Sequence, residues 1–495
     1  MRVLLMHPER DADRETALPE DRDDLARDLD LEPLWETMAG GDRLLRTIVE
    51  QTMLNPLVEL PAIRWRLDVL ADALRHPAMI QELYDLANQG LKAQRGAWLW
   101  SGRTASSLLS RSTQIVAAAL PTLRALRQFA ERTTSQVNSP GLQNLCSRLC
   151  AELGEDYLTE VADQVRGLRF SAGMVFTAGV GPDALSTRLA LRRPPQQRHR
   201  WRELIPRPPQ RLHYTLADRD EAGARALDAL RDDATVKVAE AVATSSDHIL
   251  AFFEQLRWEA GFYLCCLRLQ HRLTACGAPI TLPEPHPVTP VVQSATGLAD
   301  AALVLRSRAA VVPSELAADD ASLVLVTGAN QGGKSTFLRG LGLAQLMMQA
   351  GMFVTANGYR ASVVRRLHTH FRREEDASLD SGKLDEELVR MSAIVDRAAA
   401  GDLVLFNESF ACTDEPEGAE IARQIVDALT RAGIRVVFVT HMFTLADGYA
   451  DRPRTVFLRP ERRADGSRSF RILPGRPLPT SHGEDVYQLV FGGSR

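Results

Sequence analysis

A glycine-rich run that ends in lysine and serine is the part of this sequence whose residue types most directly indicate chemistry. It follows the apolar segment Ser322–Thr327 and reads Gly328-Ala329-Asn330-Gln331-Gly332-Gly333-Lys334-Ser335. Glycines let the backbone wrap around phosphates with its N–H groups pointing inward, and the N-terminus of a following helix adds positive potential. In such a loop the lysine reaches the β- and γ-phosphates, and the serine hydroxyl binds Mg²⁺. We therefore expect a nucleotide site at residues 328–335 and Thr336, with Lys334 and Ser335 in these two roles.

A second apolar segment, Asp402–Phe406, is followed by Asn407 and Glu408. In nucleotide hydrolases with this type of loop, the second strand ends in an acid that holds the metal through water, and a following glutamate polarises the attacking water. Glu408 keeps the place of the general base. Asn407 contributes no charge to the metal site, so we expect weaker Mg²⁺ binding or slower turnover. The alternative is that both residues only cap a strand.

A third apolar segment, Ile434–Thr440, ends next to His441. A histidine at the end of a candidate strand, downstream of both earlier motifs, is suited to sense the γ-phosphate, although a lone histidine is more often structural. The three segments together predict Lys334, Glu408 and His441 as catalytic residues. They also predict Ser335 and Asn407 as metal-site residues.

These motifs need a sheet to hold them, and the surrounding sequence fits one. After residue 285, short apolar strands alternate with helical patterns, which is typical of a parallel α/β sheet. Apolar residues recur at helical spacing over 31–168 and 221–285, whereas 169–220 has short alternating runs and many prolines. We expect an acidic segment over 1–30, two helical regions, a small β-containing insertion over 169–220, and an α/β domain over 286–495.

The composition of the 495 residues, 45% of them hydrophobic, is that of a multidomain protein able to bury more than one core. No apolar run approaches the ~20 residues of a membrane-spanning helix, and the N-terminus becomes charged early. We expect a cytoplasmic protein. The net charge of −4 gives no global reason to expect nucleic acid.

Charge is nevertheless spread unevenly along the chain. Residues 9–32 are rich in Asp and Glu, and we expect a solvated tail rather than a mimic of DNA. Residues 188–211 carry eight arginines against one glutamate, enough to neutralise several phosphates. The alternative for this stretch is a solvated, proline-stiffened loop. The DNA contacts predicted from it are Arg192, Arg193, Arg198, Arg200 and Arg202.

The motifs together resemble the ATPase domain of the MutS family of DNA mismatch repair proteins. Residues 327–336 fit the family loop Thr-Gly-x-Asn-x-Gly-Gly-Lys-Ser-Thr, in which Asn330 and Gly332 occupy positions that a generic phosphate loop leaves free. Residues 407–418, 471–475 and 480–483 are similar to other segments of that domain. Upstream, residues 42–46 and 63–70 resemble the start of the family's helical core.

The resemblance implies ATP and Mg²⁺ as cofactors and an ABC-type P-loop ATPase domain over 286–495. It implies a helical core and levers over 31–168 and 221–285, with a DNA clamp over 169–220. Family members complete each ATP site across a homodimer with a serine, and Ser381 of Ser381-Gly382-Lys383 stands in that segment here. We expect neither the family's N-terminal mismatch-reading domain, because lever-like sequence begins near residue 31, nor a nuclease domain after Phe491.

Two hypotheses follow from these features. The preferred one is a homodimeric, slow ATPase whose nucleotide state opens and closes helical levers around duplex or branched DNA, in repair or recombination. The alternative is a nucleotide-gated scaffold that binds proteins, with little or no hydrolysis and no role on DNA. Asn407 and the expected lack of a mismatch reader motivate this alternative.

Overall fold

The computed structural model describes residues 1–96, 104–170, 173–180, 186–192, 215–217, 219–328, 332–373, 382–462 and 468–478. The chain is mixed α/β and divides into two compact units. Unit 1 comprises residues 1–3, 82–136 and 144–257, and unit 2 comprises residues 4–81, 137–143 and 258–495. In the described parts of the chain, no helix has the length and apolar character needed to cross a membrane.

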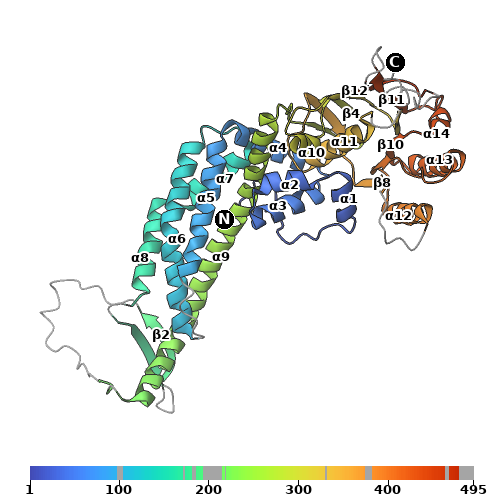
Figure 1. The fold of residues 1–495 in the computed structure, drawn as a ribbon. Coiled ribbons are helices and arrows are strands. Elements are labelled where there is room, and N and C mark those ends of the chain that lie inside the picture. Colours follow the sequence, from blue (N-terminus) through green and yellow to red (C-terminus); the bar gives the residue numbers. More distant parts are fainter. Residues whose placement is uncertain are drawn as a thin grey trace, which may run out of the picture. The chain divides into compact units, whose positions relative to one another are not determined.

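Unit 1 is built mainly from long helices. They are α6 (Ala105–Thr133) and α8 (Glu155–Gly167), with most of α5 (Pro77–Gly96), α7 (Pro140–Glu152) and α9 (Glu221–Ala275). Figure 1 shows α5, α6, α8 and α9 side by side. Ile115 and Leu250 are buried together, with Leu91 packed against them. A Cβ at Gly90 would lie 2.5 Å from the ring of Phe253, so glycine permits the close approach of α5 and α9.

A separate two-stranded sheet also lies in unit 1, within the predicted insertion. Its strands are β1 (Val175–Val180) and β2 (Ser186–Arg192), which pair antiparallel with Val175 opposite Arg192. The Nε of Arg192 donates to the hydroxyl oxygen of Thr177 over 3.3 Å. This cross-strand bond ties the end of β2 to β1.

The start of the chain is not the solvated tail that its composition predicts. Within residues 9–32 that expectation is wrong from Leu25 onward, because Leu25, Asp28 and Leu29 are buried. Residues 4–6, which precede the acidic stretch, are also buried in unit 2. The carboxylate of Glu259, itself fully buried on α9, accepts the N–H groups of Leu5 (2.6 Å), Met6 (3.1 Å) and Ala12 (2.8 Å). Backbone N–H groups buried away from water need such acceptors, and one carboxylate serves three of them here.

Two of the acids that follow lie against arginines. Asp24 forms an ion pair with Arg373, and Asp21 lies 3.9 Å from Arg397. Leu25, which follows Asp24, is buried. The segment continues into four helices, α1 (Arg22–Asp28), α2 (Glu32–Ala39), α3 (Arg43–Leu54) and α4 (Leu60–Arg75).

The larger sheet of unit 2 has six strands in the order β12-β11-β6-β10-β9-β8. β11, β6, β10, β9 and β8 run parallel, and β12 pairs antiparallel with β11 at one edge. The three predicted apolar strands are confirmed as β6, β9 and β10. The strand bounds are β6 (Leu323–Thr327), β8 (Leu367–Phe371), β9 (Leu403–Asn407), β10 (Arg435–Thr440), β11 (Thr455–Arg462) and β12 (Arg468–Pro474).

A second, four-stranded sheet has the order β3-β7-β4-β5 and was not expected from the sequence. β3 and β7 are parallel, whereas β4 is antiparallel to both β7 and β5. Unit 2 therefore holds two mixed sheets rather than one parallel sheet. The elements are β3 (Glu284–His286), β4 (Gln293–Leu298), β5 (Ser314–Ala317) and β7 (Gly358–Ser362), together with α10 (Ala301–Ser307).

Helices cover both faces of the six-stranded sheet, which explains why β6, β8 and β10 are buried throughout. On one face Phe406 and Phe438 share a core with Met391 of α12 and Val426 of α13. On the other face α11 approaches closely, because a Cβ at Gly342 would lie 2.8 Å from Leu405. Figure 1 shows this arrangement of α11 (Lys334–Gln349), α12 (Lys383–Arg397), α13 (Glu415–Arg431) and α14 (Phe443–Asp447).

Candidate active site

The predicted chemical residues follow the carboxyl ends of three adjacent parallel strands. β6 leads into Gly328 and the loop before α11, β9 ends at Asn407, and β10 is followed by His441. β10 pairs with both β6 and β9. Because the three strands are parallel, their ends meet at one edge of the sheet, the place where open α/β sheets bind ligands.

Two glycines of the loop hold backbone conformations that other residues rarely adopt. Gly328 has φ of 135° and Gly333 has φ of 89°. A Cβ at Gly333 would also lie 2.9 Å from the carbonyl oxygen of Phe470. Gly333 caps the N-terminus of α11, so the free N–H groups of that helix lie next to the loop. Ala329, Asn330 and Gln331 lie outside the described residues.

The side chain of Lys334 is buried at the centre of the site, with 3% of its surface exposed. Its Nζ donates to the carbonyl oxygen of Gly328 over 2.6 Å and lies 3.5 Å from Oε1 of Glu408. A buried ammonium group is costly unless acceptors surround it, and these contacts supply them. Lys334 thus joins the loop after β6 to the end of β9.

Glu408 lies between two groups that favour its ionised form. Nδ1 of His441 is 3.7 Å from Oε2, whereas Lys334 approaches the other carboxylate oxygen, Oε1. The nearby imidazole of His441 and the attraction of Lys334 together hold the pKa of Glu408 below its usual range, against the opposing effect of burial. The carboxylate is therefore ionised at neutral pH, as a proton acceptor must be.

The backbone of Glu408 is also unusual. Its φ of 53° is left-handed, and its N–H donates to the carbonyl oxygen of Val439 on β10 over 2.8 Å. A non-glycine residue in this region is strained, and such strain is common where a side chain must point in a set direction. The turn presents Glu408 toward Lys334 and His441.

The predicted metal-site residues are in direct contact. The hydroxyl of Ser335 donates to Oδ1 of Asn407 over 2.9 Å. A hydroxyl and an amide oxygen suit a hard cation such as Mg²⁺, which keeps several waters and takes few protein ligands. In the part of the chain that the structure describes, no group of three or more His, Cys, Asp or Glu is arranged to hold a metal ion. The pair is neutral, so the residues fit Mg²⁺ but attract it only weakly.

A cavity of about 270 Å³ opens beside the N-terminus of α11. Its lining includes Gly333, Thr336 and Phe337 from the loop and helix, Leu303 from α10 and Phe470 from β12. The loop motif predicts Thr336 as a nucleotide-site residue, whereas it predicts neither Leu303 nor Phe470. No sequence signal marks them, because the cavity is assembled from segments far apart in the chain.

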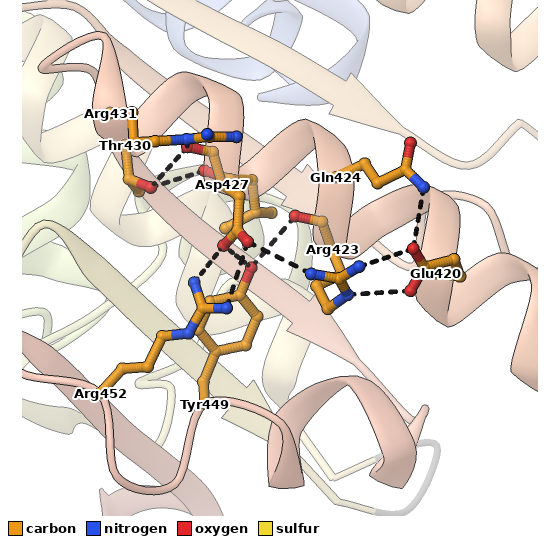
Figure 2. Close-up of polar contacts among 9 residues, drawn as sticks. Glu420, Arg423, Gln424, Asp427, Thr430, Arg431, Tyr449 and Arg452 are labelled. Carbon is orange, nitrogen blue, oxygen red and sulfur yellow. Dashed lines mark hydrogen bonds and ion pairs between the residues drawn. The ribbon is translucent and has the colours of Figure 1, made fainter.

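A second polar cluster anchors the segment that follows His441. Asp427 of α13 accepts the hydroxyl of Tyr449 over 2.7 Å, pairs with Arg452, and lies 3.5 Å from Arg423 (Figure 2). The guanidinium of Arg452 also lies 4.6 Å from the centre of the Tyr449 ring. We call Asp427, Tyr449, Arg452, Arg423 and Glu420 the α13 cluster.

Several predicted site residues cannot be placed. Arg193, Arg198, Arg200, Arg202 and Ser381 lie outside the described residues. Of the five arginines predicted to contact DNA, Arg192 alone is described, at the end of β2.

Comparison with known proteins gives two matches to one family. Residues 58–276 match the MutS2 N-terminal domain, and residues 324–458 match MutS domain V. The second match contains Lys334, Glu408 and His441. The two matches lie on either side of the boundary near residue 285 that the sequence predicts.

Individual relatives match over shorter stretches. The DNA mismatch repair protein MutS of Desulforamulus reducens is 33% identical over 190 residues, covering 34% of this chain and 22% of that protein. The endonuclease MutS2 of Geobacillus kaustophilus is 34% identical over 161 residues, covering 32% and 20%. The DNA mismatch repair protein MutS of Thermus thermophilus is 29% identical over 188 residues, covering 38% and 23%. The matched part spans less than a quarter of each relative's length. With both domain matches, these similarities place the chain in the MutS family.

Proposed function

We propose that this MutS-family protein binds and hydrolyses ATP with Mg²⁺ at the ends of β6, β9 and β10, and that the bound nucleotide controls its binding to DNA. The observation that carries the proposal is the convergence of Lys334, Glu408 and His441 next to the N-terminus of α11. At such an edge an ammonium group can bind a phosphate, and a neighbouring carboxylate can accept a proton from an attacking water.

Each residue has a distinct role in the proposed reaction. The loop from Gly328 to Thr336 and the N–H groups of α11 hold the phosphates, and Lys334 turns from Glu408 toward the β- and γ-phosphates. Glu408 accepts a proton from water as the water oxygen bonds to the γ-phosphorus. The bond from that phosphorus to the bridging oxygen breaks, so that ADP leaves. His441 contacts the γ-phosphate.

Ser335 and Asn407 are the residues proposed to hold Mg²⁺. When bound, the ion neutralises charge on the phosphate oxygens. Because Asn407 is neutral, it orients a metal-bound water without adding Coulombic attraction. We therefore propose slow turnover. The cavity lined by Thr336, Phe337 and Phe470 is suited to the adenine base, since it is mainly apolar and adjoins the phosphate loop.

The proposal for DNA rests on the relatives and on charge. Relatives carry the names DNA mismatch repair protein MutS and endonuclease MutS2. We propose that Arg192, Arg193, Arg198, Arg200 and Arg202 contact the phosphate backbone. We also propose a homodimer in which Ser381 of one subunit completes the ATP site of the other. The helical regions over 31–168 and 221–285 act as levers, and 169–220 acts as the clamp.

An ATPase assay with linear, mismatched and branched DNA tests both halves of the proposal. We expect a low basal rate that at least one DNA changes, and a Glu408→Gln variant that binds ATP without hydrolysing it. The triple change Arg198→Glu, Arg200→Glu and Arg202→Glu should abolish DNA binding at low salt. The matched control is Arg225→Glu with Arg231→Glu on α9, where each arginine already pairs with an acid.

Two outcomes would contradict parts of the proposal. Unchanged turnover in Glu408→Gln rules out the catalytic assignment. ATP binding without turnover, together with no DNA binding at low salt, supports the scaffold alternative, which the neutral contact between Ser335 and Asn407 favours.

A further inference from the structure

The turn that carries Glu408 is strained at two residues. Glu408 has φ of 53° and Phe410 has φ of 63°, both in the left-handed region that disfavours residues with a Cβ. Such a turn persists only where the surrounding structure holds it. The contacts that hold it therefore decide where the Glu408 carboxylate points.

The strongest of these contacts comes from α12. Oε2 of Glu387 accepts the N–H of Phe410 over 2.6 Å and also lies 3.6 Å from Sγ of Cys412. Glu387 is only 5% exposed, so its carboxylate has little water around it. A charged acceptor in such a place makes a strong hydrogen bond. One acid side chain thus fixes the backbone on the far side of Ser409 from Glu408.

The strand β8 encloses the same turn through His370. Its ring stacks on that of Phe410 with centroids 5.3 Å apart and planes 18° apart. Nδ1 lies 2.7 Å from the hydroxyl oxygen of Ser409, and Nε2 lies 3.0 Å from the carbonyl oxygen of Glu387. Burial lowers the pKa of His370 to about 4, so the ring is neutral at pH 7. It ties the turn to α12 without adding charge.

The opposite end of the turn is held by β10. The N–H of Glu408 donates to Val439, as described above, and a Cβ at Gly418 would lie 2.3 Å from the carbonyl oxygen of Phe410. The absence of a side chain at Gly418 lets α13 close over the turn. With β10 and α13 packed in this way, the hydrogen bond from Phe410 to Glu387 is a direct contact between α12 and the backbone of the turn.

We propose that Glu387 is a positioning residue for Glu408, and that α12 sets the catalytic geometry through the hydrogen bond from Phe410 to Glu387. This inference rests on the proposed ATPase function. Glu387 acts through the backbone of the turn, at the N–H of Phe410. It keeps the 408–410 turn in the one conformation that points the Glu408 carboxylate between Lys334 and His441. Because Glu387 lies on α12 and bonds to Phe410, a shift of this helix moves the turn.

The test compares turnover with nucleotide affinity in variants of the full-length protein. Glu387→Ala removes the acceptor, and we expect kcat to fall by about 10- to 100-fold, because small misplacements of a general base cost that much. The Kd for ATP, measured with a fluorescent analogue, should change by less than about twofold. Glu387→Gln keeps an acceptor oxygen at the same reach and should restore most of kcat.

Glu386→Gln is the matched control, because Glu386 is the neighbouring acid on α12 and faces Arg373 instead of the turn. It should leave both kcat and Kd unchanged. If Glu387→Ala fails to fold, Glu387→Asp decides the question. Its carboxylate is too short to reach Phe410 unless the turn moves, so kcat should fall while ATP binding persists.

Glu408→Gln is measured in parallel, so that the two proposals can fail separately. If Glu408→Gln abolishes turnover while Glu387→Ala or Glu387→Asp turns over at the full rate, the positioning role is wrong and the ATPase assignment stands. Equal losses of kcat and ATP affinity in the Glu387 variants also overturn the positioning role. If Glu408→Gln turns over normally, the assignment of Glu408 as the general base is wrong and the positioning role fails with it. If the parent chain shows no turnover, the proposed ATPase function is wrong.

Discussion

Two acid-centred networks lie in unit 2, and they differ in what their acids face. At the strand ends, Glu408 lies between Lys334 and His441, and each contact is 3.5 Å or longer. In the α13 cluster, Asp427 receives a direct hydrogen bond from Tyr449 and pairs with Arg452. The contacts of Glu408 are long, and its turn is strained. The contacts of Asp427 with Tyr449 and Arg452 are short, and Asp427 lies within the regular helix α13. The long contacts at the strand ends allow Lys334 and Glu408 to interact with a ligand, whereas the short contacts of Asp427 stabilise the fold.

The comparison predicts that variants separate into two classes. Changes at the strand ends should alter turnover or its Mg²⁺ requirement and leave the free energy of unfolding nearly unchanged. Changes in the α13 cluster should lower the free energy of unfolding and leave turnover unchanged. Four variants test this separation.

The largest expected effect is that of Glu408→Gln. The amide cannot accept a proton, so kcat should fall by about 10²- to 10⁴-fold, or about 3–5 kcal/mol in the barrier. Phosphate release measures turnover, and urea unfolding measures stability. Because Glu408 is strained and its contacts are long, the midpoint in urea should hardly change. A large loss of stability in this variant would remove the distinction between the networks.

Asp427→Asn should have the opposite profile. Burial alone would raise the pKa of Asp427, but the hydrogen bonds from Arg452 and Tyr449 outweigh it and hold the pKa below its ordinary value near 3.8. A carboxylate with a lowered pKa stabilises the fold above its unfolded-state pKa, and this contribution is lost as pH falls through the folded-state pKa. We expect Asp427→Asn to cost about 1–2 kcal/mol at pH 7.

Urea unfolding from pH 7 to below pH 4 checks this prediction. The parent chain should lose stability as the pH falls through the lowered pKa of Asp427, and the difference from Asp427→Asn should shrink over the same range. The exposed Asp396→Asn on α12 serves as the control. A difference between parent and Asp427→Asn that does not change with pH would mean that the charge on Asp427 contributes little.

The strand-end motifs were predictable because their signals are local. A glycine-rich loop after an apolar strand identifies Gly328 and Lys334 within a few residues, and an acid after a buried strand identifies Glu408 in the same way. The predicted strands at 322–327, 402–406 and 434–440 agree with β6, β9 and β10 within one residue. The helical spacing over 221–285 likewise predicts the region that α9 occupies.

Other features depend on residues distant in the chain, and no local pattern reports them. The packing of residues 4–6 depends on Glu259, about 250 positions away. The acidic composition of residues 9–32 likewise does not reveal that Leu25 and Leu29 are buried. Phe470 joins the cavity through the antiparallel pairing of β12, and Glu387 acts on a turn in another strand's loop. The four-stranded sheet was missed because its strands are short and interrupted by α10 and β6.

Asn407→Asp sharpens the comparison by adding charge to the strand ends. The carboxylate would increase the attraction for Mg²⁺ next to Ser335, and we expect about tenfold tighter binding, or about 1.4 kcal/mol. The Mg²⁺ concentration that gives half-maximal turnover measures this effect. In Ser335→Ala, the Mg²⁺ concentration that gives half-maximal turnover should rise instead. If Asn407→Asp needs as much Mg²⁺ as the parent chain, then Asn407 does not belong to the metal site.

Tyr449→Phe is the mildest test and the cleanest one for the α13 cluster. It removes the hydroxyl that donates to Asp427 and keeps the ring beneath the guanidinium of Arg452. Because Asp427 keeps its arginine partners, the loss should be about 1 kcal/mol in the free energy of unfolding. Turnover should stay at the parent level, since the ring still anchors the segment after His441. If turnover falls instead while stability holds, the α13 cluster sets the position of His441, and the two networks act as one.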